Sequence, residues 1–591
     1  MVIGLNKIPL YIQGKLRDIL ELWRTSELTK GIILVILVGV VSGLGAVIFR
    51  WAISGFDSVF FDGGEEALGF LGRYYVILIP ALGGLLVGPL IYFFAREAKG
   101  HGVPEVMLAV AATGGRIRAR VAAVKTLASS ICIGSGGSVG REGPIVQIGS
   151  SVGSSLGQWF RLREEWVRLL VACGAAGGIS ATFNAPIAGI FFSLELILRQ
   201  FNLRNFIFVG LSSITATTIA RAFLGDSPSF THIPEYAWTS AWEIPFYILL
   251  GVIAAFVAWG FVRALYKCED LFNSWRFPEY LKPAFGGIAI GLMGLYYSDL
   301  FGVGYEGMET AILGGFGVGA LVGMGLLKIL ATSFTIGSGG SGGVFAPSLF
   351  MGAMLGSAFG VGVHTLFPTA ITESGAYGLV GMGAVFAAAA HAPITAILIL
   401  FEMTRDYLII VPLMLAVVVS TFTARRLSRE SIYTMKVKRM GIEITEGEVD
   451  PLKLVRVRDV MTRDFPTVSP EMPIKKLLTE LEKTGHHGFP VVDQEGCLYG
   501  CVTLSDVEAA MKRGSYDFKV RDIAIRNPVI VYPDQTVHEA LLRIGALDVG
   551  RIPVVDRNDP TRLLGVLRRH DIVRAYTKAV PKRQKLPPRQ Q

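Results

Sequence analysis

Two glycine-rich loops in this chain have nearly the same sequence. GSGGSVGREGP occupies residues 134–144 and GSGGSGGVFAP occupies residues 337–347, and seven positions agree at a constant offset of 203. Each loop ends in a proline followed by an apolar run, and proline is typical of the first turn of a helix. A helix N-terminus carries about half a positive charge and free N–H groups. Two such ends brought together would bind an anion without a side-chain cation.

Glu142 stands at the expected start of the helix that follows the first loop. A carboxylate at this place competes with an anion for the same N–H donors, and its protonation would release the site. An ionisable residue inside a membrane segment is a functional candidate, so we expect Glu142 to be a gate, a proton acceptor or both. The alternative is that the glycines only allow membrane helices to pack closely.

The rest of the chain predicts the frame that holds these loops. Its 591 residues are 51% hydrophobic and 17% charged, whereas a soluble globular chain is about 25% charged. Apolar segments recur from about residue 30 to 425, and glycine or proline interrupts many of them. Short, broken apolar helices at corresponding places in two halves are typical of transporters built from internal repeats. We expect an all-α membrane domain over about 30–440, and a soluble region after it.

A second match supports a duplication. Ala185-Pro186-Ile187 is repeated as Ala392-Pro393-Ile394 at an offset of 207, and Glu195 is repeated as Glu402. We therefore expect an inverted repeat of broken and tilted helices, with repeat one over about 30–225 and repeat two over about 240–425.

The C-terminal region repeats as well. VRDVMTRDFPTV begins at Val457 and VRDIAIRNPVIV begins at Val520, and each is followed by a Pro-Val-Val-Asp strand and a final helix. The pattern predicts two copies of a small α/β unit, at 456–513 and 520–578, packed face to face. A basic tail follows at 579–591.

Charge predicts the topology and excludes some functions. Basic residues lie before the first span and after the last one, among them Lys7, Lys15, Arg24, Arg425 and Arg426. By the positive-inside rule, the segment 1–29 and the C-terminal region face the cytoplasm, and we expect a bacterial plasma membrane. No basic face interleaved with aromatic residues indicates nucleic-acid binding.

An enzyme and a metal site are not expected either. The sequence has no nucleophile elbow, and no strand precedes either glycine-rich loop, as a phosphate-binding loop would require. Cys497 and Cys501, with His486 and His487 upstream, do not have the spacing of a common zinc site. We expect buried thiols there.

With these motifs in view, the chain resembles the CLC family of chloride channels and chloride/proton exchangers over about 30–440. The resemblance rests on four motifs, GREGP at 140–144, GGVFAP at 342–347, GHGVPE at 100–105 and SIYTMK at 431–436. The resemblance implies chloride transport by a homodimer, with one pathway in each subunit and Glu142 as the gate. It also implies the anion-binding residues His101, Gly102, Arg141, Gly143, Val344, Phe345 and Tyr433. Lys125, 17 residues before Glu142, matches a basic residue beneath the pathway.

Two positions depart from the family pattern. His101 replaces the serine of the central anion site, where an imidazole can donate an N–H, take a charge or carry a proton; alternatively it points away. Leu196 stands where proton-coupled members have a glutamate, and its neighbour Glu195 matches a residue regarded as structural. The proton-pathway candidates are Glu142, Glu195 and His101. We expect a passive voltage- or pH-gated chloride channel, with a chloride/proton antiporter as the alternative.

The C-terminal region resembles the paired CBS domains of many family members. In such domains an aspartate of the pattern G-h-h-T/S-x-x-D binds ribose hydroxyls. The first copy has Thr503 and Asp506, whereas the second has Arg568 and Asp571. The resemblance implies binding of ATP, ADP or AMP, and the alternative is a purely structural or dimerising region. CBS pairs also accompany divalent-cation transporters, but few acidic residues lie in the predicted spans.

Overall fold

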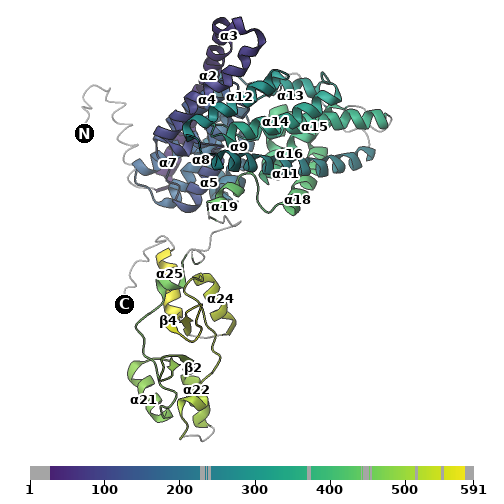
Figure 1. Ribbon diagram of the computed structural model, residues 1–591. Helices are drawn as coiled ribbons and strands as arrows, with labels where there is room; N and C mark the ends of the chain where they lie inside the picture. The colour runs from purple at the N-terminus through teal and green to yellow at the C-terminus, as the bar shows by residue number, and fades with distance from the viewer. Residues whose placement is uncertain are drawn as a thin grey trace, which may run out of the picture. The chain divides into compact units, whose positions relative to one another are not determined.

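The computed structural model describes residues 27–226, 241–368, 374–440, 455–512, 517–547 and 551–579, together with Phe230, Ile233, Pro234, Tyr236, Ile442 and Leu452. The described residues fall into two compact units that divide between residues 446 and 447 (Figure 1). Most of the expected N-terminal segment 1–29 and the basic tail 579–591 lie outside the described residues.

The first unit consists of helices. Its first half contains α2 (Glu27–Phe60), α3 (Asp62–Leu68), η1 (Gly69–Tyr74), α4 (Tyr75–Phe94), η2 (Arg96–Ala98), α5 (Val103–Ala112), α6 (Arg120–Gly134), α7 (Glu142–Trp159), α8 (Glu164–Phe183), α9 (Pro186–Phe192), the π-helical segment η3 (Ser193–Leu198) and α10 (Leu203–Leu224). Its second half contains η4 (Ala241–Glu243), α11 (Ile244–Ser274), η5 (Glu279–Leu281), α12 (Lys282–Gly294), η6 (Ser298–Leu300), α13 (Tyr305–Ile312), α14 (Val318–Gly337), α15 (Phe345–Leu366), α16 (Gly375–Ala390), α17 (Pro393–Thr404), α18 (Ile410–Leu427) and α19 (Thr434–Arg439).

Among the described residues, seven helical stretches are long and apolar enough to cross a membrane, and shorter apolar helices lie between them. Only helices or closed barrels can span hydrocarbon, because every backbone polar group must be satisfied internally. The expected all-α membrane domain with interrupted helices is confirmed. It is a multi-pass unit whose broken helices end inside the protein.

The same helix crossing occurs in both halves of this unit. Gly149 of α7 faces the carbonyl of Gly174 of α8, and Gly352 of α15 faces the carbonyl of Gly381 of α16. At both crossings a Cβ atom would collide with the opposite backbone. Small residues allow such close backbone contact in membrane proteins. The two helix pairs therefore fix the directions of α7 and α15, which start at the two glycine-rich loops.

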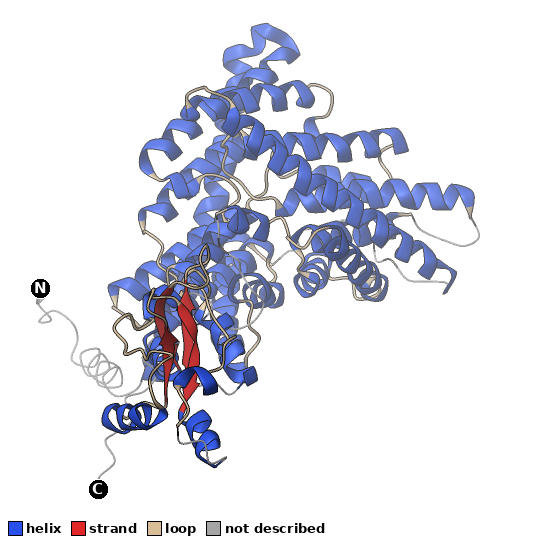
Figure 2. Ribbon diagram, turned by 60° about the horizontal axis from the view of Figure 1, so that its bottom comes forward, coloured by secondary structure: helices blue, strands red, loops and turns tan. Residues whose placement is uncertain are grey.

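The second unit contains all the strands among the described residues (Figure 2). Its first copy comprises α20 (Val457–Val460), α21 (Ile474–Thr484), β1 (Gly488–Val492), β2 (Leu498–Thr503) and α22 (Leu504–Lys512). The second comprises α23 (Val520–Ile523), α24 (Val537–Leu547), β3 (Arg551–Val555), β4 (Leu563–Arg568) and α25 (Arg569–Ala579). Each copy has one antiparallel strand pair with a β-bulge at the same place, between Val491 and Val492 and between Val554 and Val555.

The two copies exchange their first segments. Val457, at the start of the first copy, packs in the core of the second copy with Val537 and Ile552. Val520, at the start of the second copy, packs in the core of the first with Leu477 and Phe489. Each core therefore needs residues from both copies, so the pair forms one folding unit.

The glycine crossing in the second half gives a test. Gly352→Ala should lower the free energy of unfolding by about 1–3 kcal/mol, the usual cost of overpacking, because the added methyl meets the backbone of α16. Gly362→Ala on the same helix is the matched control, since nothing lies within 4 Å of its Cβ position. Thermal unfolding of the purified protein in detergent measures both. Equal midpoints for the two variants would contradict the crossing.

Candidate anion site

The two glycine-rich loops bind each other directly. The Gly140 N–H donates to the Gly343 carbonyl at 2.8 Å, and the Gly343 N–H donates to the Gly140 carbonyl at 2.6 Å. The loop before α5 joins them, because the Gly100 N–H donates to the Gly340 carbonyl at 3.0 Å. The non-helical backbone at the centre of the membrane unit thus satisfies its own polar groups, as the apolar surroundings require.

Three helices begin at these paired loops. Gly102 is the residue before α5, Glu142 is the first residue of α7, and Phe345 is the first residue of α15. At Gly143 a Cβ would overlap the carbonyl of His101, so the loops approach each other as closely as glycine allows. The first N–H groups of a helix have no partner within it. The arrangement therefore gathers backbone donors from both halves in one place.

The Glu142 carboxylate accepts a hydrogen bond from one of these backbone donors. Its Oε2 accepts a hydrogen bond from the Ala346 N–H at 3.4 Å, in the first turn of α15, and its Oε1 accepts one from the Tyr305 hydroxyl at 3.2 Å. The residue is 1% exposed. A carboxylate from repeat one thus lies at a helix N-terminus of repeat two, as a tethered anion would.

Tyr305 is a member of this site that the sequence analysis missed. It is the first residue of α13, and the guanidinium of Arg141 lies over its ring at 5.2 Å from the centroid. The loop before α13 repeats the loop before α5 at an offset of 202, because Gly302 and Gly304 correspond to Gly100 and Gly102. That weaker repeat was the signal that could have found it.

His101 and Tyr433 lie together on another wall of the site. Their ring centroids are 6.2 Å apart, and both residues are 1% exposed. The Nδ1 atom of His101 is buried and has no hydrogen-bond partner among the described residues. The Tyr266 hydroxyl donates to the Ile432 carbonyl at 2.7 Å and fixes the segment that carries Tyr433. The structure brings these two predicted residues together.

Val344 and Phe345 are 1% and 2% exposed. The Phe345 ring packs on Phe386 at 4.2 Å and on Phe183 at 5.3 Å between centroids. Phe183 is the last residue of α8, and Phe386 lies in the last two turns of α16. Contacts from both repeats therefore hold the start of α15.

Two buried lysines support the loops from equivalent places. The Lys125 ammonium donates to the carbonyls of Ala98 and Gly100 at 2.9 and 2.8 Å. The Lys328 ammonium donates to the carbonyls of Leu300 and Gly302, both at 3.1 Å. The two lysines are 203 residues apart, the offset of the glycine-rich loops. The same offset would have identified Lys328, which the sequence analysis missed.

A buried ion pair joins α19 to α5. The Lys436 ammonium lies 2.5 Å from Glu105 Oε1, and both side chains are 13% exposed. Lys436 is one helical turn after Tyr433, and Glu105 is in the first turn of α5. The pair therefore connects the helix that follows Tyr433 to the helix that follows His101.

Comparison with known proteins identifies this architecture. A family model described as voltage gated chloride channel matches residues 83–425, and the CBS domain model matches residues 457–513 and 520–578. The chain belongs to the CLC family.

Relatives span both named activities of that family. The putative chloride channel protein ClcB-like of Ralstonia nicotianae is 34% identical over 415 residues, which cover 68% of this chain and 95% of that protein. The H(+)/Cl(−) exchange transporter ClcA of Vibrio cholerae is 34% identical over 413 residues, 68% of this chain and 88% of that protein. The chloride channel protein CLC-e of Arabidopsis thaliana is 28% identical over 618 residues, which cover 91% of this chain and 86% of that protein.

Solved structures share the fold. The crystal structure of a slow cyanobacterial Cl−/H+ antiporter matches with a TM-score of 0.63 and 28% identity, over 69% of this chain and 97% of that one. The crystal structure of a eukaryotic CLC transporter matches with a TM-score of 0.64 over 92% of this chain and 98% of that one. At 20% identity the second likeness shows the fold alone. The protein is thus a multi-pass CLC anion transporter or channel with two CBS domains.

The glutamates at the ends of the Ala-Pro-Ile helices have reciprocal partners in this CLC protein. Glu195 accepts hydrogen bonds from the N–H groups of Ile394 and Thr395, at 3.2 and 2.8 Å, and from the Thr395 hydroxyl at 2.6 Å. Glu402 accepts from the N–H groups of Ile187 and Ala188 at 3.0 and 2.7 Å. Each carboxylate caps the helix of the other repeat.

Leu196 lies beside Glu195 in the π-helical segment η3 and is 5% exposed. A buried aliphatic side chain cannot bind a proton. At this place in the CLC fold the chain therefore has an apolar residue, and its acidic neighbour is used in the helix cap.

The two CBS copies differ at the predicted nucleotide residues. In the first copy, Asp506 Oδ2 accepts from the Thr503 N–H and hydroxyl at 2.8 and 2.6 Å. In the second copy, the Arg568 guanidinium donates to both carboxylate oxygens of Asp571, at 2.9 and 3.0 Å, and to Thr462 at 2.8 Å. Burial opposes ionisation of Asp571, but the hydrogen bonds from Arg568 outweigh it and lower the pKa of the carboxyl.

The buried ion pair gives a second test. Lys436→Met should lower the free energy of unfolding by about 3–5 kcal/mol, because it leaves the Glu105 carboxylate buried without a counter-charge. Adding Glu105→Gln should recover part of this loss, since the double variant has no unpaired charge. Unfolding of the wild type, Lys436→Met, Glu105→Gln and the double variant in detergent measures the cycle. A double variant as unstable as the sum of the single ones would show that the pair does not interact.

Proposed function

We propose that this CLC protein is a passive chloride channel gated by Glu142. The observation that carries the proposal is the position of the Glu142 carboxylate on the first turn of α15. A side chain that holds the same donors as the permeating anion closes the site while it is charged and in place. Protonation or displacement of the carboxylate opens it.

The opened site holds the anion by partial charges. In this proposal the N–H groups at the starts of α5, α7 and α15 bind the anion at the place that Glu142 leaves, and His101 and Tyr433 form the other wall. Gly102, Arg141, Gly143, Val344 and Phe345 complete the proposed anion-binding set. Partial charges bind an anion weakly enough for it to leave, which conduction requires.

Passive conduction is favoured by the residues around η3. Leu196 is apolar, and both carboxylate oxygens of Glu195 accept hydrogen bonds from N–H groups at the start of α17. Proton coupling needs a second proton acceptor besides Glu142, and neither residue supplies one. Chloride/proton exchange is the second candidate, because several relatives bear that name; His101 would then be the second proton site.

We also propose that the protein is a homodimer in a bacterial plasma membrane, with its N-terminal segment and CBS domains in the cytoplasm. The basic residues at the end of α18, Arg425 and Arg426, support this orientation under the positive-inside rule.

Glu142→Gln tests the gate. The neutral amide no longer competes as an anion, so chloride efflux from proteoliposomes at neutral pH should rise by about tenfold, the factor for about 1.4 kcal/mol of competition removed. The efflux should also lose its dependence on pH. Wild-type protein in the same lipid is the control, and an unchanged pH dependence in the variant would contradict a glutamate gate.

A measurement of reversal potential in the same proteoliposomes distinguishes the channel from the exchanger. For a channel it follows the chloride gradient alone. A shift with the pH gradient at constant chloride would establish exchange and refute the inference from Leu196.

We propose further that an adenine nucleotide binds to the first CBS copy. Asp506 Oδ1 makes no hydrogen bond among the described residues, so it is available to a ribose hydroxyl, while Thr503 holds Oδ2. In the second copy Arg568 occupies both oxygens of Asp571. The second copy would have to break this pair to bind in the same way.

Calorimetric titration of the full-length protein with ATP tests this asymmetry. Asp506→Ala should weaken ATP binding by about tenfold or more, as expected when a hydrogen bond to a charged group is lost. Asp571→Ala is the matched control and should leave the affinity unchanged. The opposite ranking of the two variants would assign the nucleotide to the second copy.

A further inference from the structure

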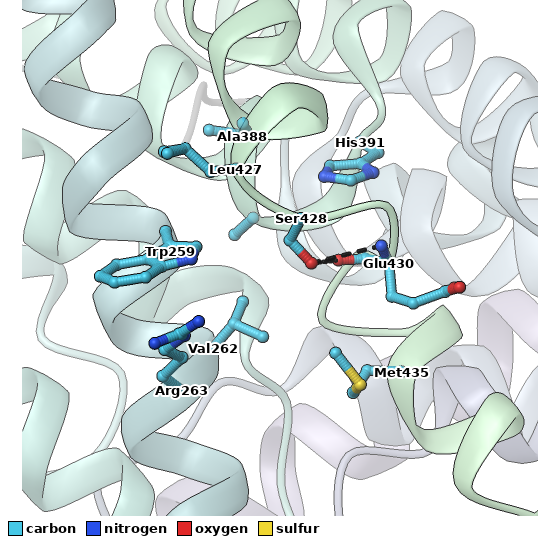
Figure 3. A pocket seen from close by; sticks show the side chains of 11 residues that line it. Trp259, Val262, Arg263, Ala388, His391, Leu427, Ser428, Glu430 and Met435 are labelled. Carbon is cyan, nitrogen blue, oxygen red and sulfur yellow. Dashed lines mark hydrogen bonds between the residues drawn. The ribbon is translucent and has the colours of Figure 1, made fainter.

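A small cavity lies where α11, α16 and α18 meet the connection between α18 and α19 (Figure 3). Its volume is about 120 Å³. Most of its wall is apolar, and the polar side chains that reach it are Arg263, His391, Ser428 and Glu430. The anion site described above shares none of these residues.

The cavity has charge complementarity to an anion. The Arg263 guanidinium lies over the Trp259 ring at 4.0 Å from the centroid. Within the part of the chain that the structure describes, no carboxylate forms an ion pair with Arg263. Glu430, the acidic residue of the wall, is already paired with Lys438 at 2.9 Å. The permanently charged guanidinium is therefore the free charge of the cavity.

Arg263 also marks the end of an apolar face on α11. Leu249 and Phe256 are 48% and 52% exposed, and Arg263 follows at the same spacing of seven residues, so the three share one face of the helix. Charged residues, including Lys267 and Asp270, follow within the next two helical turns. Tryptophan and arginine at the end of an apolar helix face are typical of the membrane–water interface. This pattern favours headgroup depth for the cavity.

We propose that this cavity binds the headgroup of an anionic phospholipid from the leaflet at the C-terminal end of α18. The phosphate binds to the Arg263 guanidinium, and the acyl chains lie along the exposed face of Leu249 and Phe256. Guanidinium groups are suited to phosphate oxygens, and basic pockets between membrane helices bind lipid headgroups.

The bound lipid would act on the segment that carries Tyr433. Ser428, Glu430 and Met435, on both sides of Tyr433, line the cavity. The Ile432 N–H donates to the carbonyl of Ala389, which also lines it, at 2.8 Å. A headgroup in the cavity packs against this segment and steadies the Tyr433 wall of the anion site. This consequence rests on the proposed anion transport, and it predicts faster chloride flux in anionic lipid.

The experiment uses the full-length protein and two readouts. Lipid binding is measured by the thermal stabilisation that dioleoylphosphatidylglycerol gives in detergent, relative to dioleoylphosphatidylcholine and to inorganic phosphate. Chloride efflux is measured in vesicles of phosphatidylcholine with and without phosphatidylglycerol. Arg263→Gln is the test variant. Arg204→Gln is its matched control, because Arg204 also lies over a tryptophan, Trp166, at 4.9 Å, but lines no part of this cavity.

Arg263→Gln should weaken phosphatidylglycerol binding by about fivefold, the factor for one arginine near an anionic surface. It should also abolish the lipid response of efflux, whereas Arg204→Gln should retain both. Equal responses in the two variants would overturn the proposal. Stabilisation by inorganic phosphate as large as that by the lipid would assign the cavity to a free anion.

Two further outcomes also decide the question. If Arg263→Gln changes the oligomeric state while the lipid response persists, a second copy of the chain covers this face and the proposal is wrong. If wild-type protein transports no chloride, the proposed function fails, yet the stabilisation measurement still reports on lipid binding.

Discussion

The pairing of the two glycine-rich loops is the constraint on which the membrane unit depends. Backbone that leaves the helical conformation inside hydrocarbon must find partners within the protein. Gly140 and Gly343 supply them to each other, so neither half can form its loop without the other. The helix starts that collect at this pairing are thus a consequence of how the loops are satisfied, and the site exists only in the assembled repeat.

The three lysines near this site are engaged within the protein. Lys125 and Lys328 donate to backbone carbonyls, and Lys436 is paired with Glu105. The lysines consequently stabilise the loops and helices, and the helix starts present peptide N–H groups. Such donors favour weak binding and fast release.

Sequence alone predicted the membrane fold, the paired loops and the place of Glu142, because glycine-rich loops inside apolar sequence have few other uses. It did not predict Tyr305, since the loop before that residue repeats only at isolated positions, and it missed Lys328 although Lys125 lies at the loop offset of 203. It also did not predict that Val457 and Val520 exchange cores between the CBS copies, because both copies present the same pattern in either arrangement. Both carboxylate oxygens of Asp571 accept hydrogen bonds from Arg568, whereas Asp506 uses one oxygen for Thr503. This difference depends on side-chain geometry, which the sequence motif does not predict.

The reciprocal caps of Glu195 and Glu402 give a structural reason for an acidic residue in η3, directly after α9. Five hydrogen bonds cross between the repeats there, three to Glu195 and two to Glu402. A carboxylate is a favourable cap for a helix N-terminus. Symmetry therefore assigns this glutamate pair to joining the repeats, whereas Glu142 has no acidic counterpart in the second loop, where Phe345 stands at the corresponding position.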